Sequence, residues 1–560
     1  MRRDHAMLRF HGRDAGAWLH GQTTNDVQGL VSDQGNLQAL VNRQGRLLCV
    51  FELYRFEDEF WAIIETTQLS ALLDRHESHR FLEDAEVEVL AESSGQILIE
   101  GPHAQLFLWE LLEPAPSLGE TPLPEAAGAF QPVRLCGHDA LVFRSTETGE
   151  DGYLIIPAPG EEDALYEALA AEGMARGVEE ISEAARNTLR FESGLPRYGI
   201  DWNDETVIAE TPFERLAVRY DKGCYPGQEV VTRLKTYGTP KRALVGLLAE
   251  GDDPRLPEHG DPVSAGEIRI GTWCGHAYSP TLGRWIGRAY LNRTHRTEGE
   301  THALTGPHGE SFRGEVRHLP LVEPGRREDF ANRLYHDALA IFERDTHDQD
   351  ESAIHLLENV IRLVSNHEDA YEVLGVILHR HHRVDEAIAI MKKLAVLNPA
   401  CVMAHTNLSV FYLSKGLIQE AEEEKAIAGQ LEFQHQLDAR QAAKRAGEER
   451  ARIRAEAEER IAMFREVLDI DPEDPIATMG MGSAHMQLEQ YAEAIPYLEA
   501  AARLQKDYSA AFLNLGKCHE FSGQPDAARA AYRDGIAAAG RKGDLMPMRE
   551  MERRLKALGG

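Results

Sequence analysis

Short segments in which apolar and polar residues alternate run from the start of the chain to about residue 320, and they predict strands mixed with helices. Apolar-rich runs at 47–56 and 60–65 are joined by a short acidic turn, which predicts a β-hairpin. Similar runs at 87–90 and 96–100 flank a Ser-Ser-Gly sequence at 93–95 and predict a second hairpin. The first part of the chain is therefore expected to contain antiparallel sheet.

Helices are expected between these strands, and a small barrel after them. The last of the helices begins at a capping Ser182 and ends at Gly194. From about residue 242 to 321, short strands return between Gly and Pro residues, which is typical of a small antiparallel barrel. The apolar spacing places helices at four ranges: 15–20, 69–81, 164–171 and 182–192.

A spacing of 34 residues between small or apolar positions organises the second half of the chain. This period indicates tetratricopeptide repeats, in which small residues recur because paired helices must approach closely. We expect about five units between 334 and 542, with a degenerate one near 441–474, where the charged run 439–465 predicts a longer, solvated helix. The spacing relates four sets: Ala353, Ala387 and Ala421; Leu374 and Leu408; Gly482 and Gly516; Ala494 and Ala528.

These patterns predict an α+β N-terminal half followed by an all-α repeat solenoid. We expect a mixed α/β region at 1–240, a β-barrel at 241–322, a linker at 323–333 and a tetratricopeptide-repeat domain at 334–560. The repeats offer a concave binding surface and carry no chemistry of their own.

Composition and charge narrow the classes of function. Hydrophobic residues make up 43% and charged residues 27% of the chain, as in ordinary globular proteins. The net charge of −32 argues against direct binding of nucleic acid, which depends on cationic side chains. Neither a signal peptide nor a transmembrane helix is expected, because no sufficiently long apolar run is present.

Cysteines and histidines give little sign of a metal site. The six cysteines are scattered without a Cys-x-x-Cys pair, which argues against a zinc knuckle or a disulfide framework, so we expect a cytoplasmic protein. The run from His379 to Arg383 contains three histidines. It falls in the turn between two repeat helices, where adjacent side chains point in different directions, so a solvated loop is favoured over a metal site.

The most distinctive stretch is the twelve-residue run from Lys222 to Arg233, Lys-Gly-Cys-Tyr-Pro-Gly-Gln-Glu-Val-Val-Thr-Arg. Its glycines, Gly223 and Gly227, predict a tight, exposed turn. Cys224 lies two residues after the lysine, and a cationic neighbour favours the reactive thiolate form of a cysteine.

Two interpretations of this loop stay open. In the first, Cys224 is a redox-active or cluster-facing thiolate favoured by Lys222, and Glu229 and Arg233 hold the loop or meet a partner. In the second, the glycines serve only the turn, Glu229 and Arg233 pair locally, and Cys224 is passive. A single cysteine supplies at most one ligand to an iron–sulfur cluster.

The same loop, with Tyr225, Gly227, Gln228 and Glu229, resembles the signature of the YgfZ family. Members of this family are folate-binding relatives of the glycine-cleavage T-protein and support iron–sulfur enzymes. Five further stretches resemble segments of the same family or of the T-protein, in the same order along the chain. They are 18–27, 40–48, 148–153, 189–199 and 280–284.

The resemblance implies a ring of mixed α/β subdomains plus the barrel, around a central funnel that holds a tetrahydrofolate. Glu192 falls where a T-protein carboxylate grips the pterin, and a carboxylate accepts two parallel hydrogen bonds from a 2-amino-pyrimidinone edge. The alternative places Glu192 exposed at a helix C-terminus. Tyr153 and Tyr198 either offer a stacking face to the cofactor or pack in turns, and Arg233 is a further candidate for cofactor binding.

One departure from the T-protein concerns catalysis. The T-protein motif has two adjacent acidic positions, which include the aspartate that orients the amine for one-carbon transfer. In this chain Cys49 and Val50 occupy these positions. Neither residue orients an amine as an aspartate does, which argues against aminomethyl transfer. Cys49 is either a compensating ligand or, as strand cysteines usually are, a small core residue.

We therefore expect a YgfZ-like, tetrahydrofolate-binding accessory protein and not an enzyme. It would support assembly or repair of iron–sulfur enzymes, including those that modify tRNA, with transient contact to a cluster. Its repeats would recruit an iron–sulfur enzyme or assembly protein. Two alternatives remain: a folate-dependent aminomethyl or one-carbon transferase, and a non-catalytic repeat scaffold.

Overall fold

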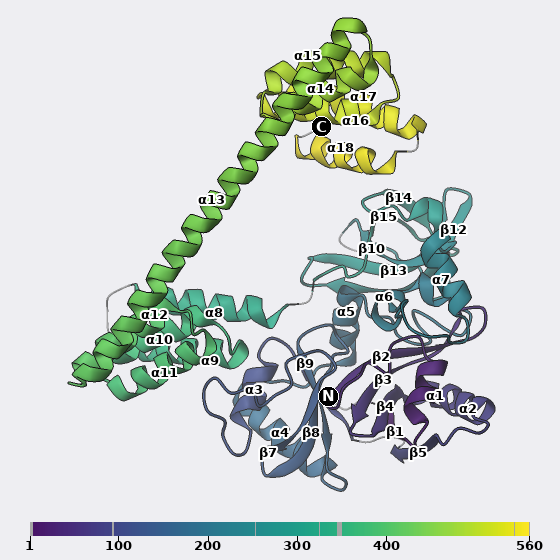
Figure 1. Cartoon of the computed structure of the whole chain (residues 1–560). Helices are drawn as coiled ribbons and strands as arrows, with labels where there is room; N and C mark the ends of the chain where they lie inside the picture. Colours follow the sequence, from purple (N-terminus) through teal and green to yellow (C-terminus); the bar gives the residue numbers. More distant parts are fainter. Residues whose placement is uncertain are drawn as a thin grey trace. The chain divides into compact units, whose positions relative to one another are not determined.

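The computed structural model describes residues 4–91, 95–251, 254–323, 325–343, 350–542 and 544–558 (Figure 1). The chain divides into two compact units, Met1–Lys425 and Ala426–Gly560. The first contains two sheets, a closed barrel and the first repeat helices, and the second is helical throughout its described part. Among the described residues, no helix combines the length and apolar character needed to cross a bilayer.

The first sheet has five strands in the order β2-β3-β4-β1-β5. Strands β3 and β4 pair as the predicted hairpin, from Phe51 opposite Ile64 to Phe56 opposite Glu59, which confirms that prediction. Helices α1 and α2 supply apolar residues to its core. The elements are β1 (His5–His11), α1 (Ala15–Gln22), β2 (Gln34–Val41), β3 (Leu47–Phe56), β4 (Glu59–Glu65), η1 (Thr66–Gln68), α2 (Leu69–His79) and β5 (Glu86–Ala91).

The second sheet has four strands in the order β6-β9-β8-β7. It packs on the first sheet through aromatic side chains, with the rings of Tyr54 and Phe143 4.6 Å apart. Its elements, with two helices that accompany it, are β6 (Ile97–Glu100), α3 (Ala104–Glu110), β7 (Phe130–Leu135), β8 (His138–Arg144), β9 (Gly152–Pro157) and α4 (Glu162–Ala175).

The second predicted hairpin is wrong. Both of its strands form, but β5 pairs with β1 in the first sheet and β6 pairs with β9 in the second. Alternation of apolar residues indicates a strand without identifying its partner, and here the partners are distant in sequence. Of the predicted Ser93-Ser94-Gly95 turn, Ser93 and Ser94 lie outside the described residues.

Helix α5 (Glu183–Ser193) connects the sheets to the barrel. The Ser182 hydroxyl accepts a hydrogen bond from the Ala185 amide, and Gly194 ends the helix in the left-handed conformation with φ of 78°, as predicted. Phe191 packs with Leu248 and Ile286 of the barrel. The next elements are η2 (Ile208–Glu210), α6 (Phe213–Ala217) and α7 (Gln228–Tyr237).

The barrel is closed, in the strand order β10-β13-β12-β11-β14-β15, and confirms the predicted fold of this segment. The buried Trp273 lies in its core. Its elements are β10 (Arg242–Ala249), β11 (Pro262–Ala265), β12 (Ile268–Ser279), β13 (Arg284–Asn292), η3 (Arg293–His295), β14 (Thr301–Thr305) and β15 (Ser311–Arg317).

Repeat helices begin in the first unit. Ala353, Ala387 and Ala421, the residues spaced by 34, are 0%, 0% and 1% exposed, as close helix packing requires. The first helix starts at Arg327, inside the expected linker, whose Pro324 lies outside the described residues. The helices are α8 (Arg327–Phe342), α9 (Asp350–Leu363), α10 (Glu368–Arg380), α11 (Val384–Leu397), α12 (Val402–Ser414) and α13 (Ile418–Ile470).

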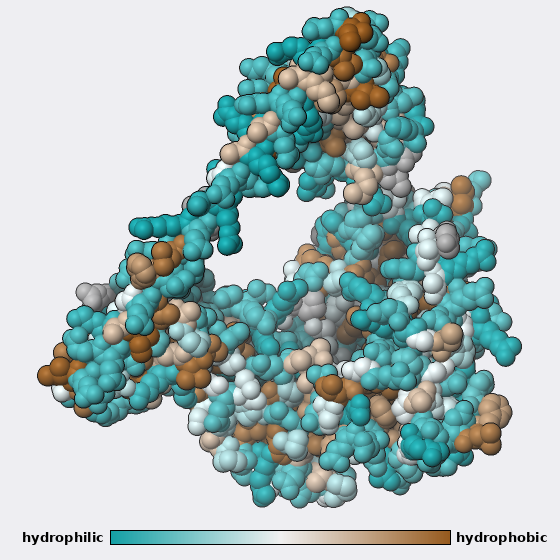
Figure 2. All heavy atoms as spheres, in the orientation of Figure 1, coloured by the Kyte–Doolittle hydropathy of each residue, from teal (hydrophilic) through white to brown (hydrophobic). Residues whose placement is uncertain are grey.

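Helix α13 has 53 residues and replaces the degenerate repeat. The charged run 439–465 is helical, as predicted, and the helix extends beyond it on both sides. The segment contains no proline to end it, and Figure 2 shows mostly hydrophilic residues along its middle part.

The first repeat helices pack directly on the second sheet's helix α3. Leu106 belongs to the same apolar core as Leu357 and Ile361 of α9. The Gln105 side-chain amide donates a hydrogen bond to the Arg362 carbonyl oxygen at 2.7 Å, and Lys393 donates to the Leu118 carbonyl. Within the first unit, the repeats are therefore joined to the α/β region by apolar and polar contacts.

The second unit repeats one packing arrangement. An added Cβ at Gly482 would lie 2.6 Å from Leu498 Cδ2, and one at Gly516 would lie 2.2 Å from Tyr532 Cε1. Both the glycines and their partners are 34 residues apart, which explains the period in the sequence. The helices are α14 (Pro475–Gln487), α15 (Tyr491–Leu504), α16 (Ser509–Phe521), α17 (Pro525–Lys542) and α18 (Leu545–Ala557).

Candidate functional site

A cavity of about 450 Å³ lies between the first sheet, α5 and the loop that follows it. Its volume is in the range of small-molecule sites. We call it the central cavity and define it by six of its lining residues: Val50, Glu52, Glu65, Asn187, Arg190 and Tyr198. Of these, only Val50 and Tyr198 were singled out from the sequence.

Strands β3 and β4 supply one side of the central cavity. Val50 and Glu52 are two residues apart on β3 and therefore share one face of the sheet. The Val50 amide donates to Gln68 Oε1 at 2.9 Å, and the Gln68 side chain donates to Glu65 at 3.1 Å. Glu52 accepts a hydrogen bond from the Ser145 hydroxyl. This side of the cavity is thus a valine surrounded by hydrogen-bonded carboxylates.

Helix α5 supplies a cationic side. Arg190 is 6% exposed and donates to Asp201, which also forms an ion pair with Arg288 at 3.2 Å. Burial alone would raise the pKa of Asp201, but the Arg288 and Arg190 guanidinium groups outweigh it and lower that pKa. Two buried guanidinium groups therefore share one buried carboxylate next to the cavity.

Three polar atoms of this helix have unused hydrogen-bonding capacity. Arg190 Nε and Nη2 and Asn187 Oδ1 are buried, and none of them has a hydrogen-bond partner within the described part of the chain. Both residues line the central cavity. Buried polar groups are nearly always satisfied, so these atoms have the capacity to bond a polar ligand in the cavity.

Glu192 is buried and lies away from these atoms. It is 4% exposed, so the interpretation that it is an exposed residue at the helix end is wrong. Its carboxylate accepts hydrogen bonds from the Ser279 hydroxyl and, at 3.3 Å, from the Thr281 hydroxyl of the barrel segment. It is not among the residues that line the central cavity. Pterin contact by Glu192 stays a prediction.

The two candidate tyrosines lie in different environments. Tyr198 lines the central cavity, with its ring edge-on to Trp202 at 4.9 Å. Tyr153 is 1% exposed, its hydroxyl donates to Gln105 Oε1 at 3.2 Å, and burial raises its pKa to about 12. Gln105 in turn donates to Arg362 of the repeats, so Tyr153 lies beneath the contact between the α/β region and the repeats.

Lys222 anchors the cysteine loop. Its ammonium group donates to the carbonyl oxygens of His20 at 2.6 Å, Thr23 at 2.7 Å and Asn25 at 2.8 Å. Burial lowers the pKa of Lys222 to about 8. Cys224 itself is exposed. The lysine therefore fixes the loop to the end of α1, and the thiol is presented outward.

The glycines and the other residues of the cysteine loop pack against neighbouring segments of the fold. Gly227 has φ of 85°, and an added Cβ would lie 2.3 Å from the Asn42 carbonyl oxygen. One at Gly223 would lie 3.7 Å from His20 Nε2. Gln228 donates to the Lys222 carbonyl oxygen at 3.3 Å, and Tyr225 is buried. The 222–233 motif thus packs against two others recognised in the sequence, 18–27 and 40–48.

Glu229 and Arg233 are exposed on α7, four residues apart on one side of the helix. Neither lines the central cavity. Their expected roles, in partner contact for both and cofactor binding for Arg233, stay predictions.

The two residues at the acidic positions of the T-protein motif face opposite sides of β3. Val50 faces the central cavity, whereas Cys49 is 0% exposed in the core of the first sheet. Burial raises the pKa of the Cys49 thiol to about 12. Cys49 packs as a small core residue and does not reach the cavity.

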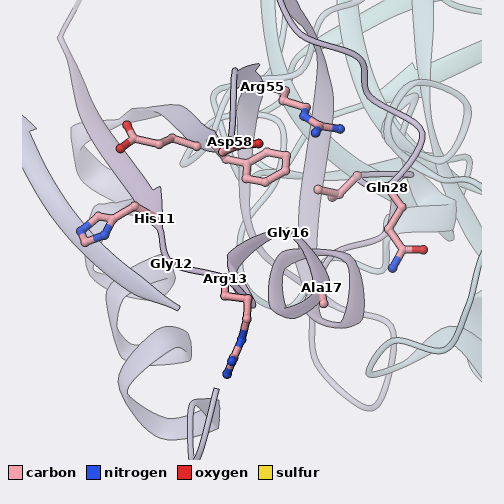
Figure 3. Close-up of a pocket in the computed structure, with 11 residues that line it drawn as sticks. His11, Gly12, Arg13, Gly16, Ala17, Gln28, Arg55 and Asp58 are labelled. Atoms are coloured by element: carbon pink, nitrogen blue, oxygen red, sulfur yellow. The ribbon is translucent and has the colours of Figure 1, made fainter. Parts of the chain in front are cut away.

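A larger, more open hollow of about 640 Å³ lies beside α1 and the β3–β4 turn (Figure 3). Arg13, Gln28 and Arg55 point in different directions there. Arg55 donates to the carbonyl oxygens of Leu30 at 2.8 Å and Glu57 at 3.0 Å, so its guanidinium group is used within the fold. This hollow does not gather convergent polar groups as the central cavity does.

The histidine run at the end of α10 has separate partners. His379 Nε2 lies 3.0 Å from the Ser414 hydroxyl, and His381 Nε2 lies 2.6 Å from Asp350 Oδ2. Across the described ranges, no group of three or more His, Cys, Asp or Glu side chains is arranged to hold a metal ion.

Comparison with known proteins identifies the family to which the chain belongs. Residues 5–222 match the GCVT N-terminal domain, and residues 242–323 match the glycine cleavage T-protein C-terminal barrel domain. The aminomethyltransferase of Thermoanaerobacter sp. (strain X514) is 30% identical over 288 residues, which span 51% of this chain and 75% of that protein. The chain belongs to the glycine cleavage T-protein family.

A second T-protein relative agrees with this assignment, and the repeats match models of their own. The aminomethyltransferase of Streptomyces coelicolor is 32% identical over 294 residues, covering 51% of this chain and 75% of that protein. Residues 351–400 and 474–540 match tetratricopeptide-repeat models. A crystal structure of the aminomethyltransferase of Bartonella henselae aligns with a TM-score of 0.49 at 24% identity, covering 57% of this chain and 84% of that one.

The expected combination of a T-protein-like fold with repeats is therefore confirmed. Four residues of the central cavity were missed by the analysis of the sequence: Glu52, Glu65, Asn187 and Arg190. A signal was available for two of them. Asn187 and Arg190 are three residues apart in a helix that was predicted, so they share one side of it.

Proposed function

We propose that this member of the T-protein family binds tetrahydrofolate in the central cavity and acts as an accessory protein for iron–sulfur enzymes. The proposal combines the family with the volume of the cavity and the unused polar atoms of Asn187 and Arg190 that line it. Bound folate would supply a one-carbon carrier. The residues of this chain would bind and orient it.

The observation that carries the accessory role is the position of Val50. It lines the cavity where the T-protein motif has an acidic residue, and a valine neither orients nor deprotonates an amine. Cys49, at the adjacent acidic position, is buried in the core. The side chains at these two positions thus favour folate binding without aminomethyl transfer.

The position of the cysteine loop favours contact with a partner protein. Cys224 is exposed, while Lys222 holds the loop through three carbonyl oxygens. A fixed, outward-facing thiol suits transient contact with a cluster or a sulfur-carrying protein. The repeats would recruit that protein, and because the first repeat helices pack on α3, these would hold it close to the folate-binding region. All six cysteines are free thiols, which fits the reducing cytoplasm we propose.

Complementation of a deletion strain tests this role. Loss of the gene should lower aconitase-type and radical tRNA-modifying activities under oxidative stress, and the wild-type chain should restore them. A Cys224→Ala variant should fail to restore them, whereas Cys401→Ala, at a half-buried repeat cysteine, should succeed. Normal activities in the deletion strain, or full rescue by Cys224→Ala, would count against the accessory role.

A second candidate is a folate-dependent one-carbon transferase. One observation favours it: Glu52 places a carboxylate on the same face of β3 as Val50, two residues further along the strand. Formation of methylene-tetrahydrofolate from an amine donor by the purified chain, abolished by Glu52→Gln, would establish this activity in place of the accessory role.

A further inference from the structure

A further hollow, of about 400 Å³, lies at the edge of the barrel, where β10 meets α6 and the segment that follows β15. The paired part of β10 and β15 begins at Gly246, opposite Arg317, and residues 243–245 of β10, which precede it, line the hollow. The described linings of this hollow and of the central cavity share no residue. We call it the seam hollow and define it by five lining residues: Arg215, Pro240, Leu244, Arg296 and Leu319.

Arg296 brings a buried donor without a partner to the seam hollow. Its Nη2 donates to the Pro240 carbonyl oxygen at 3.1 Å, whereas Nη1 is buried and has no hydrogen-bond partner in the described part of the chain. Burial, together with the charge of Arg293, lowers the pKa of Arg296. A cationic donor that is buried without an acceptor costs free energy, and an anion in the hollow would offset that cost.

The two carboxylates in the lining are already matched by cations. Glu210 pairs with Arg242 at 3.1 Å, and Glu214 pairs with Lys235 of α7 at 3.5 Å. Glu214 also accepts a hydrogen bond from the Tyr220 hydroxyl at 2.6 Å. Both acidic side chains are therefore engaged within the fold, and their charges are balanced before any ligand enters.

The remaining cations at the seam hollow are not matched in this way. Arg215 is exposed on α6 and lines the hollow. Lys241 is exposed next to Pro240, and its carbonyl oxygen accepts from the amide of the exposed Arg293 at 2.9 Å. Among the described residues, no carboxylate forms an ion pair with these three side chains or with Arg296. In a chain with a net charge of −32, this local positive charge attracts anions.

The floor of the seam hollow is apolar. Leu244 is 7% exposed and packs with Leu319 in one apolar cluster. An apolar floor beside cationic side chains suits a ligand that carries a carboxylate next to an apolar group. Because Lys241 and Arg293 extend the positive charge beyond the lining, an extended acidic segment fits this surface better than a single small anion.

We propose that the seam hollow docks an acidic segment of a partner protein, with a carboxylate at Arg296 and an apolar side chain on Leu244 and Leu319. This surface is separate from the folate-binding cavity and gives the partner a contact outside the repeats. Helix α7, with ten residues and a length of about 15 Å, connects the surface with the cysteine loop. A protein that occupies the hollow and spans this helix reaches Cys224.

Fluorescence anisotropy with a fluorescein-labelled peptide of alternating glutamate and leucine tests the docking surface on the intact chain. Arg296→Gln should weaken binding roughly fivefold or more, and the exposed Arg215→Gln roughly threefold, because each removes one charge pair. The same peptide with glutamine in place of glutamate should bind roughly fivefold or more weakly. Arg269→Gln, at an exposed arginine of β12 outside the hollow, is the matched control and should bind like the wild type.

No binding of the peptide by the wild type, or equal affinity of the wild type and the Arg215 and Arg296 variants, overturns the proposal. Tighter binding of a single-stranded RNA that depends on the same two arginines would assign the surface to nucleic acid and also overturns it. Self-association of the wild type that is lost in Arg215→Gln would assign it to a second copy of the chain. Titration of these variants with tetrahydrofolate should give the wild-type result, so failure of this proposal and failure of the folate-binding function are distinguishable.

Discussion

The Lys222 ammonium group donates a hydrogen bond to the Thr23 carbonyl oxygen at 2.7 Å. This contact joins two segments that are almost 200 residues apart, the 18–27 motif and the cysteine loop. Together with the bonds to the His20 and Asn25 carbonyl oxygens, it holds the lysine ammonium group against the end of α1. The lysine of the motif is thus required for the position of the loop, whatever chemistry the exposed Cys224 performs.

Substitution of Lys222 by Met should lower the unfolding free energy by about 2 kcal/mol or more, because three carbonyl oxygens lose a charged donor. All six tryptophans lie within residues 18–285, so tryptophan fluorescence during urea unfolding of the intact chain reports on this region alone. Lys235→Met, at a lysine 60% exposed, is the control and should be nearly neutral. Equal midpoints for the two variants would refute the anchoring role.

The Gly227 position should not accept a side chain. Gly227→Ala adds a Cβ 2.3 Å from the Asn42 carbonyl oxygen at a positive φ, and we expect a loss of about 3 kcal/mol or more. Gly260→Ala has a nearly identical φ of 87° with no atom within 4 Å, so it isolates the conformational cost of about 1 kcal/mol. Tryptophan-monitored unfolding compares them, and equal losses would show that the contact with Asn42 is unimportant.

Alkaline pH should destabilise the first unit through Cys49. Its pKa in the folded chain is raised from 9.0 to about 12, so between these values the unfolded thiol is ionised and the folded one is not. Unfolding then releases a proton, and stability that is complete below about pH 9 is lost as the pH rises toward 12. Cys49→Ala should flatten the pH dependence of the urea midpoint. An unaltered slope in Cys49→Ala would contradict this cause.

Two glycines of the second unit should respond to alanine with opposite signs. At Gly516 the added Cβ meets the fully buried Tyr532, and we expect a loss of about 2 kcal/mol. At Gly540, an exposed helical position with no atom within 4 Å, alanine should add about 0.5–1 kcal/mol by restricting the unfolded chain. Thermal melting followed by helical circular dichroism distinguishes them, and a shift of the same sign in both would contradict the packing.

Local patterns predicted much of the fold. The 34-residue period holds because the glycine and its partner helix repeat together, and the Ser182 and Gly194 signals delimit α5 as they do in many helices. Partners remote in sequence were not predictable: β5 and β6 have strand patterns, yet they join different sheets. Helix α13 was expected to be long, but its extent depends on the absence of breakers over 53 residues.

The site was predicted less completely. Family motifs led to Tyr198 and Val50, which line the cavity, and also to Tyr153, which is buried beneath the repeats instead. Motifs identify positions along a strand or helix, whereas the rotation of the helix decides which residues face the cavity. That rotation follows from Phe191 and Glu192 packing on the barrel, a contact between distant segments.

Calorimetric titration with tetrahydrofolate of the intact chain, of Val50→Phe and of Val89→Phe tests the central claim most directly. Val50→Phe fills the central cavity and should weaken binding roughly tenfold or more, while Val89→Phe, at an exposed position of β5, should bind like the wild type. Tryptophan fluorescence would confirm that both variants are folded. No binding by the wild type, or equal binding by the two variants, would contradict a folate site in this cavity.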